Sequence, residues 1–194
     1  MERVEIAGAE AGGATLYVTL EPCAHESALG PACAYLVAAS GLARVVVGCG
    51  DPDPRTAGKG LERIRAAGIA CEPVSSPEAE ASLSGYLMLR RHCRPEVTLK
   101  LATSLDGCIA LASGESQWIT GEAARAHGHA MRAKADAILV GGGTLRADAP
   151  RLDVRLPGLE QRSPQRWVLM HGDAPEGWQR LASPDSIRGM ADVQ

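Results

Sequence analysis

Strand-like and helix-like segments alternate along the first part of the chain, and this order constrains the fold more than any other feature of the sequence. "TLYVTL" at 15–20 alternates as a strand does, "ACAYLVAAS" at 32–40 has the composition of a short apolar helix, and "ARVVVGC" at 43–49 is a continuous apolar strand. The helix "LERIRAAG" and the strand "IACEPV" follow a turn-rich loop, "DPDPRTAGKG". This order predicts an α/β fold with a mostly parallel sheet covered on both faces.

A similar pattern restarts after a helix expected at 77–91 and the basic, proline-containing segment "HCRPEV". We therefore predict two domains, 1–93 and 94–194. The second is expected to contain strands at 96–104 and 106–111, a helix capped by Thr120, a strand leading into the triple glycine 141–143, and a strand in "QRWVLMHG". These segments are too few to complete a doubly wound sheet, so this domain is expected to be incomplete.

Composition and charge narrow the class of protein. The net charge is -3 and aromatic residues make up 3% of the chain, which argues against a nucleic-acid surface built from basic patches and stacking platforms. No apolar run approaches the roughly 20 residues needed to cross a bilayer. The N-terminus lacks the pattern of a secretion signal, so the six cysteines are expected to be thiols or metal ligands in the cytoplasm. The expected partner is a small molecule, with a homo-oligomer left open.

Two of the cysteines stand where a metal site can form. Cys23 follows Pro22 at the end of a predicted strand, and Cys33 lies at the start of a predicted helix, whose N-terminus stabilises a thiolate. Two thiolates alone do not make a zinc site, and free cysteines are often small buried hydrophobic residues. From the residues alone, a zinc site and a buried pair both remain open.

Three longer segments carry a resemblance to a known family. "GATLYVTLEPCAH" at 13–25, "ARVVVGCGDPDPRTAGKG" at 43–60 and "LKLATSLDGCIALASGESQWIT" at 99–120 resemble the bifunctional riboflavin-biosynthesis deaminase-reductase family. The resemblance implies a cytidine-deaminase-like domain followed by an incomplete dihydrofolate-reductase-like domain. It also implies zinc-dependent hydrolytic deamination of a diaminohydroxy-phosphoribosylamino-pyrimidine, and then NADPH-dependent reduction of its ribosyl chain to ribityl.

For the first domain, the resemblance implies that Cys23 and Cys33 are zinc ligands whose sulfurs face each other. It also implies a substrate loop formed by His25, Asp51, Asp53 and Lys59. The family's His-Ala-Glu, which supplies the third ligand and the proton shuttle, is expected immediately before Met1, with Glu2 as an alternative shuttle. The chain is therefore expected to be incomplete for deamination.

For the second domain, the resemblance implies Lys100 as the catalytic lysine near the reacting sugar. The residues implied to contact NADPH are Ala102, Trp118, Thr144 and Asp148, and those implied to contact substrate are Ser116, Arg132, Leu152 and Arg155. We expect these side chains to converge on one cleft at the carboxyl ends of the strands, with Arg132 and Arg155 sharing a phosphate. The family's domain continues beyond Gln194, so one wall of the cleft is expected to be open.

Two other functions remain as alternatives. The first is a stand-alone zinc nucleoside or tRNA deaminase, although such an enzyme has no use for the segment at 99–120. The second is a non-catalytic scaffold derived from the family. Zinc content and NADPH oxidation distinguish the three functions.

Overall fold

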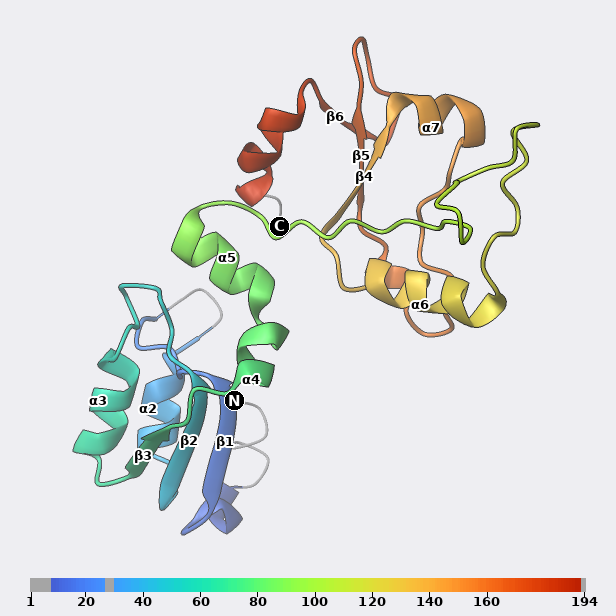
Figure 1. Cartoon of the computed structure of the whole chain (residues 1–194). Coiled ribbons are helices and arrows are strands. Elements are labelled where there is room, and N and C mark those ends of the chain that lie inside the picture. Colours follow the sequence, from blue (N-terminus) through green and yellow to red (C-terminus); the bar gives the residue numbers. More distant parts are fainter. Residues whose placement is uncertain (1–7, 27–29, 193–194) are drawn as a thin grey trace. The chain divides into compact units, whose positions relative to one another are not determined.

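The computed structural model describes residues 8–26 and 30–192. The chain divides into two compact units, Met1–Glu96 and Val97–Gln194, and each contains one three-stranded parallel sheet (Figure 1). None of the helices in the described ranges is long and apolar enough to cross a bilayer.

The first unit follows the predicted β-α-β order. Its elements are η1 (Gly8–Ala11), β1 (Thr15–Leu20), α2 (Cys33–Ala38), β2 (Arg44–Cys49), α3 (Lys59–Ala66), β3 (Ala70–Pro73), α4 (Pro77–Ser82) and α5 (Ser84–His92). The sheet order is β1-β2-β3, and Val46 of the central strand pairs with Tyr17 on one side and Glu72 on the other. The predicted strands, the two helices between them and their parallel arrangement are confirmed.

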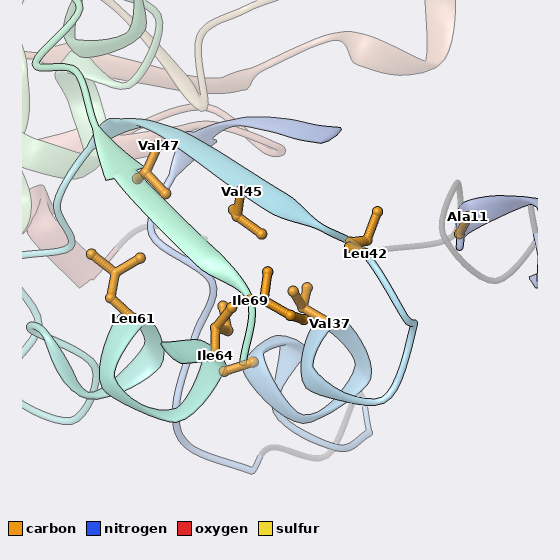
Figure 2. Packing of buried hydrophobic residues seen from close by; sticks show 9 residues of the cluster. Ala11, Val37, Leu42, Val45, Val47, Leu61, Ile64 and Ile69 are labelled. Carbon is orange, nitrogen blue, oxygen red and sulfur yellow. The ribbon is translucent and has the colours of Figure 1, made fainter. Parts of the chain in front are cut away.

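The central strand is buried on both faces, as its continuous apolar run predicts. Val45 and Val47 are fully buried against Val37 of α2 and Ile64 of α3 (Figure 2). Because successive residues of a strand face opposite sides, Gly48 lies on the other face of the sheet. A Cβ at Gly48 would lie 2.6 Å from the Cβ of Ala79, so glycine lets α4 pack directly onto that face.

The helix predicted at 77–91 is instead two helices, α4 and α5, separated at Leu83. Ser76 caps the first helix by accepting a hydrogen bond from the Ala79 backbone N–H at 3.2 Å. At the other end, the Ser82 hydroxyl donates to the Ala79 carbonyl, a local bond that competes with continuation of the helix.

The second unit has fewer regular elements. They are α6 (Glu122–Arg132), β4 (Ala137–Gly141), α7 (Gly142–Asp148), η2 (Glu160–Arg162), β5 (Gln165–Leu169), β6 (Gln179–Leu181) and η3 (Pro184–Asp192). The strand order is β4-β5-β6, and Val168 in the central strand is fully buried. The helix α6 and the strands β4 and β5 confirm predictions, whereas β6 and η3 were not predicted.

Two strand predictions in this unit are wrong. Residues 96–104 and 106–111 form no strand in the described structure, and Leu99 and Ile109 are 79% and 67% exposed. An alternating pattern forms a strand only where a neighbouring strand pairs with its backbone groups. The backbone hydrogen bonds at 104–108 instead close a local turn, in which the Ser104 N–H donates to the Cys108 carbonyl.

The predicted cap of α6 is also wrong. Gly121 occupies the N-cap position, and no side chain caps the helix. The backbone carbonyl of Thr120 accepts a hydrogen bond from Arg125 Nη1 at 2.5 Å, so Thr120 contributes its backbone and not its hydroxyl to this end of the helix.

Candidate functional site

The paired cysteines meet where β1 ends and α2 begins. The Cys33 backbone N–H donates to the Cys23 sulfur at 3.1 Å, and both side chains are half-buried. Burial, and after it the neighbouring Cys23 thiol, raises the pKa of the Cys33 thiol.

The described residues do not complete a zinc site. Among them, no group of three or more His, Cys, Asp or Glu side chains is placed to hold a metal ion, whereas catalytic zinc takes three protein ligands. Glu2, the alternative proton shuttle, lies outside the described residues. Cys23 and Cys33 alone therefore do not form a site for zinc.

A buried carboxylate organises the loop beside the cysteines. Glu21, at the end of β1, accepts backbone hydrogen bonds from Asp51 at 3.4 Å, Gly58 at 3.1 Å and Leu61 at 3.2 Å. Sequence reasoning did not select Glu21, although an acidic residue between an apolar strand and Pro22 was a usable signal. Its three bonds fix the loop 51–58 against the end of the strand.

Gly60 lets the same loop approach β1 closely. A Cβ at this position would lie 2.0 Å from the carbonyl oxygen of Pro22 and 3.2 Å from Glu21 Oε1. No side chain fits there without displacing backbone. Glycine is therefore needed at position 60 because a larger residue would clash, and not because of its backbone conformation.

The two predicted aspartates are buried and engaged by other residues of the first unit. Asp51 Oδ1 accepts from the Asp53 N–H at 2.9 Å and from the Tyr86 hydroxyl at 2.8 Å. Burial and this bond raise the pKa of Tyr86 to about 12. Asp53 accepts from Arg55 Nη2 at 2.6 Å, and hydrogen bonding by Arg55 holds its pKa well below the usual range.

His25 and Lys59 flank this loop. His25 Nδ1 lies 3.2 Å from the buried Thr56 hydroxyl, which also accepts from the Ala24 N–H at 3.4 Å. Lys59 is exposed and donates to the Pro54 carbonyl at 2.7 Å. The structure thus places the predicted substrate loop next to the segment that carries Cys23.

In the second unit, three arginines lie close together where residues 151–155 contact α6. Arg132 Nη1 donates to the Asp153 carbonyl at 2.5 Å, and the Arg155 N–H donates to His129 Nδ1 at 3.3 Å. Asp153 also forms ion pairs with Arg151 and, at 3.7 Å, with Arg155 Nε. We call His129, Arg132, Arg151, Asp153 and Arg155 the arginine cluster.

The arginine cluster carries more positive than negative charge. Burial, followed by the charge of Arg155, lowers the pKa of Arg132, and burial followed by Arg132 and Arg155 lowers that of His129. Arg132 Nε is buried without a hydrogen-bond partner in the described part of the chain. A buried, unpaired donor beside like charges is typical of a site that binds an anion.

Two other predicted residues lie against this cluster or within it. A Cβ at Gly128 of α6 would lie 3.8 Å from Lys100 Cε, so the lysine stem lies against the helix one turn before Arg132. Leu152, between Arg151 and Asp153 in the sequence, is buried and has a positive φ of 55°. Lys100, Arg132, Leu152 and Arg155 are thus brought together.

The other predicted residues lie elsewhere in the unit. Thr144 and Asp148 are exposed on α7, which begins directly after β4. Gly142, at the start of α7, is buried, and a Cβ there would lie 3.0 Å from Met170 Cβ. Figure 1 shows α6 and α7 at opposite ends of β4. Thr144 and Asp148 on α7 therefore lie at the other end of β4 from Arg132 on α6.

Three predicted residues come from the irregular segment 97–121. Ala102 is half-buried and Ser116 is exposed. Trp118 is 70% exposed, and the Arg125 guanidinium lies 4.5 Å from the centroid of its ring. This contact orients the indole through a cation–π interaction.

Comparison with known proteins shows that this chain is similar to RibD proteins. A sequence model described as the RibD C-terminal domain matches residues 95–179, which include α6, β4, α7 and the arginine cluster. The riboflavin biosynthesis protein RibD of Escherichia coli K12 is 46% identical over 161 residues, covering 82% of this chain and 44% of the relative. The chain is a homologue of RibD. The RibD of Chlamydia trachomatis is 47% identical over 81% of this chain and 42% of its own length.

Solved RibD structures share the fold. A RibD structure from Acinetobacter baumannii has a TM-score of 0.81 and 36% identity, covering 98% of this chain and 58% of the other. A Thermotoga maritima protein titled diaminohydroxyphosphoribosylaminopyrimidine deaminase/5-amino-6-(5-phosphoribosylamino)uracil reductase has a TM-score of 0.80 and 31% identity, covering 93% and 59%. The fold is therefore RibD-like, and the chain spans less than half the length of the two curated RibD relatives.

Proposed function

We propose that the second unit acts in riboflavin biosynthesis as a RibD-type reductase, which uses NADPH to reduce the ribosyl chain of a phosphoribosylamino-pyrimidine to ribityl. The main support is the arginine cluster, which lies inside the segment matched by the RibD C-terminal domain. Its guanidinium groups suit a phosphomonoester because they donate several hydrogen bonds to one anion. The Thermotoga maritima relative is named for a reductase of a phosphoribosylamino substrate.

In this proposal, residues on α6 and on the segments packed against it bind and orient the substrate. Arg132 and Arg155 hold the phosphate, and Lys100 lies one helical turn away, where it can face the sugar. His129 fixes the backbone of Arg155 by accepting its N–H at 3.3 Å. Ser116 and Leu152 complete the substrate contacts that we propose.

NADPH fits residues at the other end of β4. The support is the position of α7, which follows β4 directly through the triple glycine at 141–143. Gly142 keeps this turn close to β5, and Thr144 is exposed on it. Ala102, Trp118 and Asp148 are the further contacts that we propose, with Trp118 offering an exposed aromatic face. When bound, NADPH supplies the hydride.

For the first unit we propose a cytidine-deaminase-like fold that acts on the same class of pyrimidine. The support is the pair Cys23 and Cys33 at the end of β1, beside a loop that carries buried Asp51 and Asp53. Hydrolytic deamination in such folds requires zinc. Among the described residues, Cys23 and Cys33 are the candidate ligands, and a third is needed to hold the metal.

The reductase proposal is tested with the whole chain. Oxidation of NADPH is followed in the presence of 5-amino-6-(5-phosphoribosylamino)uracil, and NADPH binding is followed separately by quenching of tryptophan fluorescence. Substituting Arg155→Met is expected to raise KM by roughly tenfold or more, because a charge-assisted pair with the phosphate is lost. Arg162→Met, which changes an exposed arginine on η2, is the matched control.

The outcome separates the candidate functions. NADPH binding without turnover would favour the scaffold. NADPH oxidation that is unaffected by Arg155→Met would contradict the assignment of the phosphate to the arginine cluster.

A further inference from the structure

We propose that Asp153 is an internal anion that occupies the arginine cluster in the ligand-free protein and thereby weakens the binding of a phosphomonoester there. The inference rests on the proposed function, because it concerns the same phosphate site. It assigns to Asp153 the role of a competing group that the incoming phosphate has to displace from the arginines.

The contacts of Asp153 place it among the groups that would bind the phosphate. Its Oδ2 is paired with Arg151, and its Oδ1 lies 3.7 Å from Arg155 Nε. Its backbone carbonyl accepts from Arg132 Nη1 at 2.5 Å. The carboxylate is thus a local counter-charge for Arg151 and Arg155, while Arg132 contacts the backbone of the same residue.

The pairing is incomplete, which leaves the cluster able to accept a stronger anion. Asp153 Oδ1 and Arg132 Nε are both buried without a hydrogen-bond partner among the described residues. The arginine cluster holds three guanidinium groups and one carboxylate, which pairs with Arg151 and Arg155. A phosphate dianion matches the remaining positive charge better than the single carboxylate does.

Asp153 could instead strengthen binding by orienting Arg151 and Arg155, and the magnitudes decide between the two roles. The side chains of Arg151 and Arg155 are 74% and 57% exposed, and ion pairs at that exposure contribute little to ordering. Repulsion between a carboxylate and a dianion in one cluster is larger, since it acts on two charges at short range and partly out of water. The competing role is therefore expected to dominate.

The test is the affinity of the whole chain for ribose 5-phosphate, measured by calorimetry at low ionic strength. Substituting Asp153→Asn keeps the shape and an acceptor oxygen but removes the charge. It is expected to tighten binding by about fivefold or more, with a steeper loss of affinity as salt is added. Asp173→Asn, an exposed carboxylate after β5 in the same unit, is the control and is expected to change affinity less than about twofold.

Two results would overturn the inference. Weaker binding by Asp153→Asn would show that the carboxylate orients the arginines, and unchanged binding would show that it does neither. If Asp153→Asn fails to fold, Asp153→Ser provides the same removal of charge in a smaller side chain.

The proposed function is tested separately in the same assay. Arg155→Met is expected to lose ribose 5-phosphate binding whichever role Asp153 has. Binding that survives Arg155→Met would contradict the phosphate site itself, and lack of binding by every variant would overturn both the site and the inference.

Discussion

The two units differ in whether their buried polar groups have hydrogen-bond partners. In the first unit, the carboxylates of Glu21, Asp51 and Asp53 are each satisfied by hydrogen bonds from nearby backbone or side chains. In the second unit, Arg132 Nε and Asp153 Oδ1 are buried without such partners in the described residues. A satisfied network stabilises a loop, whereas an unsatisfied one has donors left for a ligand.

The units also differ in how well they cover their apolar residues. Val45 and Val47 of β2 are fully buried between helices, while Leu99 and Leu101 in the second unit are 79% and 63% exposed. All three tryptophans, Trp118, Trp167 and Trp178, belong to the second unit. Tryptophan fluorescence therefore reports on the second unit alone, whereas far-UV circular dichroism reports on both units, so a transition seen only by circular dichroism belongs to the first unit.

The largest effect is expected from Gly60→Ala in the first unit. The new Cβ would lie 2.0 Å from the Pro22 carbonyl oxygen, so the backbone of the loop or of β1 has to move. We expect the free energy of unfolding of this unit to fall by about 3 kcal/mol or more. Urea unfolding measured by circular dichroism tests this, with Gly50→Ala as control because a Cβ there meets nothing within 4 Å.

A somewhat smaller loss is expected from Glu21→Gln. The substitution keeps the size of the side chain but replaces a charged acceptor of three backbone N–H groups, and it leaves an amide N–H2 facing donors. We expect a loss of about 2 kcal/mol in the first unit, with the fluorescence transition of the second unit unchanged. Glu62→Gln on exposed α3 is the control, and an equal loss in both variants would contradict the role of Glu21.

The pH dependence of the first unit is expected to involve Asp53. Its pKa is lowered in the folded state by Arg55, so its stabilising contribution is present above the unfolded-state pKa of about 4. That contribution is lost as the pH falls through the folded-state pKa. Asp53→Asn is therefore expected to flatten the decrease in unfolding free energy below about pH 4. Unfolding curves at a series of acidic pH values measure this, and an unchanged slope would contradict it.

The smallest effect is expected from Leu99→Ala in the second unit. Because this side chain is 79% exposed, its removal is expected to change the free energy of unfolding by less than about 0.5 kcal/mol. The matched change Val47→Ala, at a fully buried position of the first unit, is expected to cost about 2 kcal/mol. Leu99→Ala is followed by fluorescence and Val47→Ala by circular dichroism. A large loss in Leu99→Ala would show that residues 97–101 are packed in solution.

Elements formed by interactions between residues close together in the sequence were predictable, and elements that need distant residues were not. The strands β1 and β2 and the helices α2 and α3 were predictable because each carries its burial pattern within one short segment. Residues 96–104 carry a similar alternation but form no strand in the described structure. Pairing with another strand depends on residues distant in the sequence, which a local pattern does not contain.

For the candidate site, residue types were predictable and their partners were not. Cys23 with Cys33, and Arg132 with Arg155, were selected from motifs, and each pair lies close together in the structure. Glu21 and Asp153 were not selected, although both contact the selected residues or their loops.

The α/β alternation and the residue types at the ends of the strands can be read from the amino-acid sequence, because both depend on residues close together along the chain. How these residue types are grouped in space is a property of the folded chain. Glu21 meets the N–H of Leu61 across 40 positions of sequence, and Arg132 meets the carbonyl of Asp153 across 21. Such contacts depend on how the chain folds back on itself, and they decide which charges are balanced internally and which remain for a ligand.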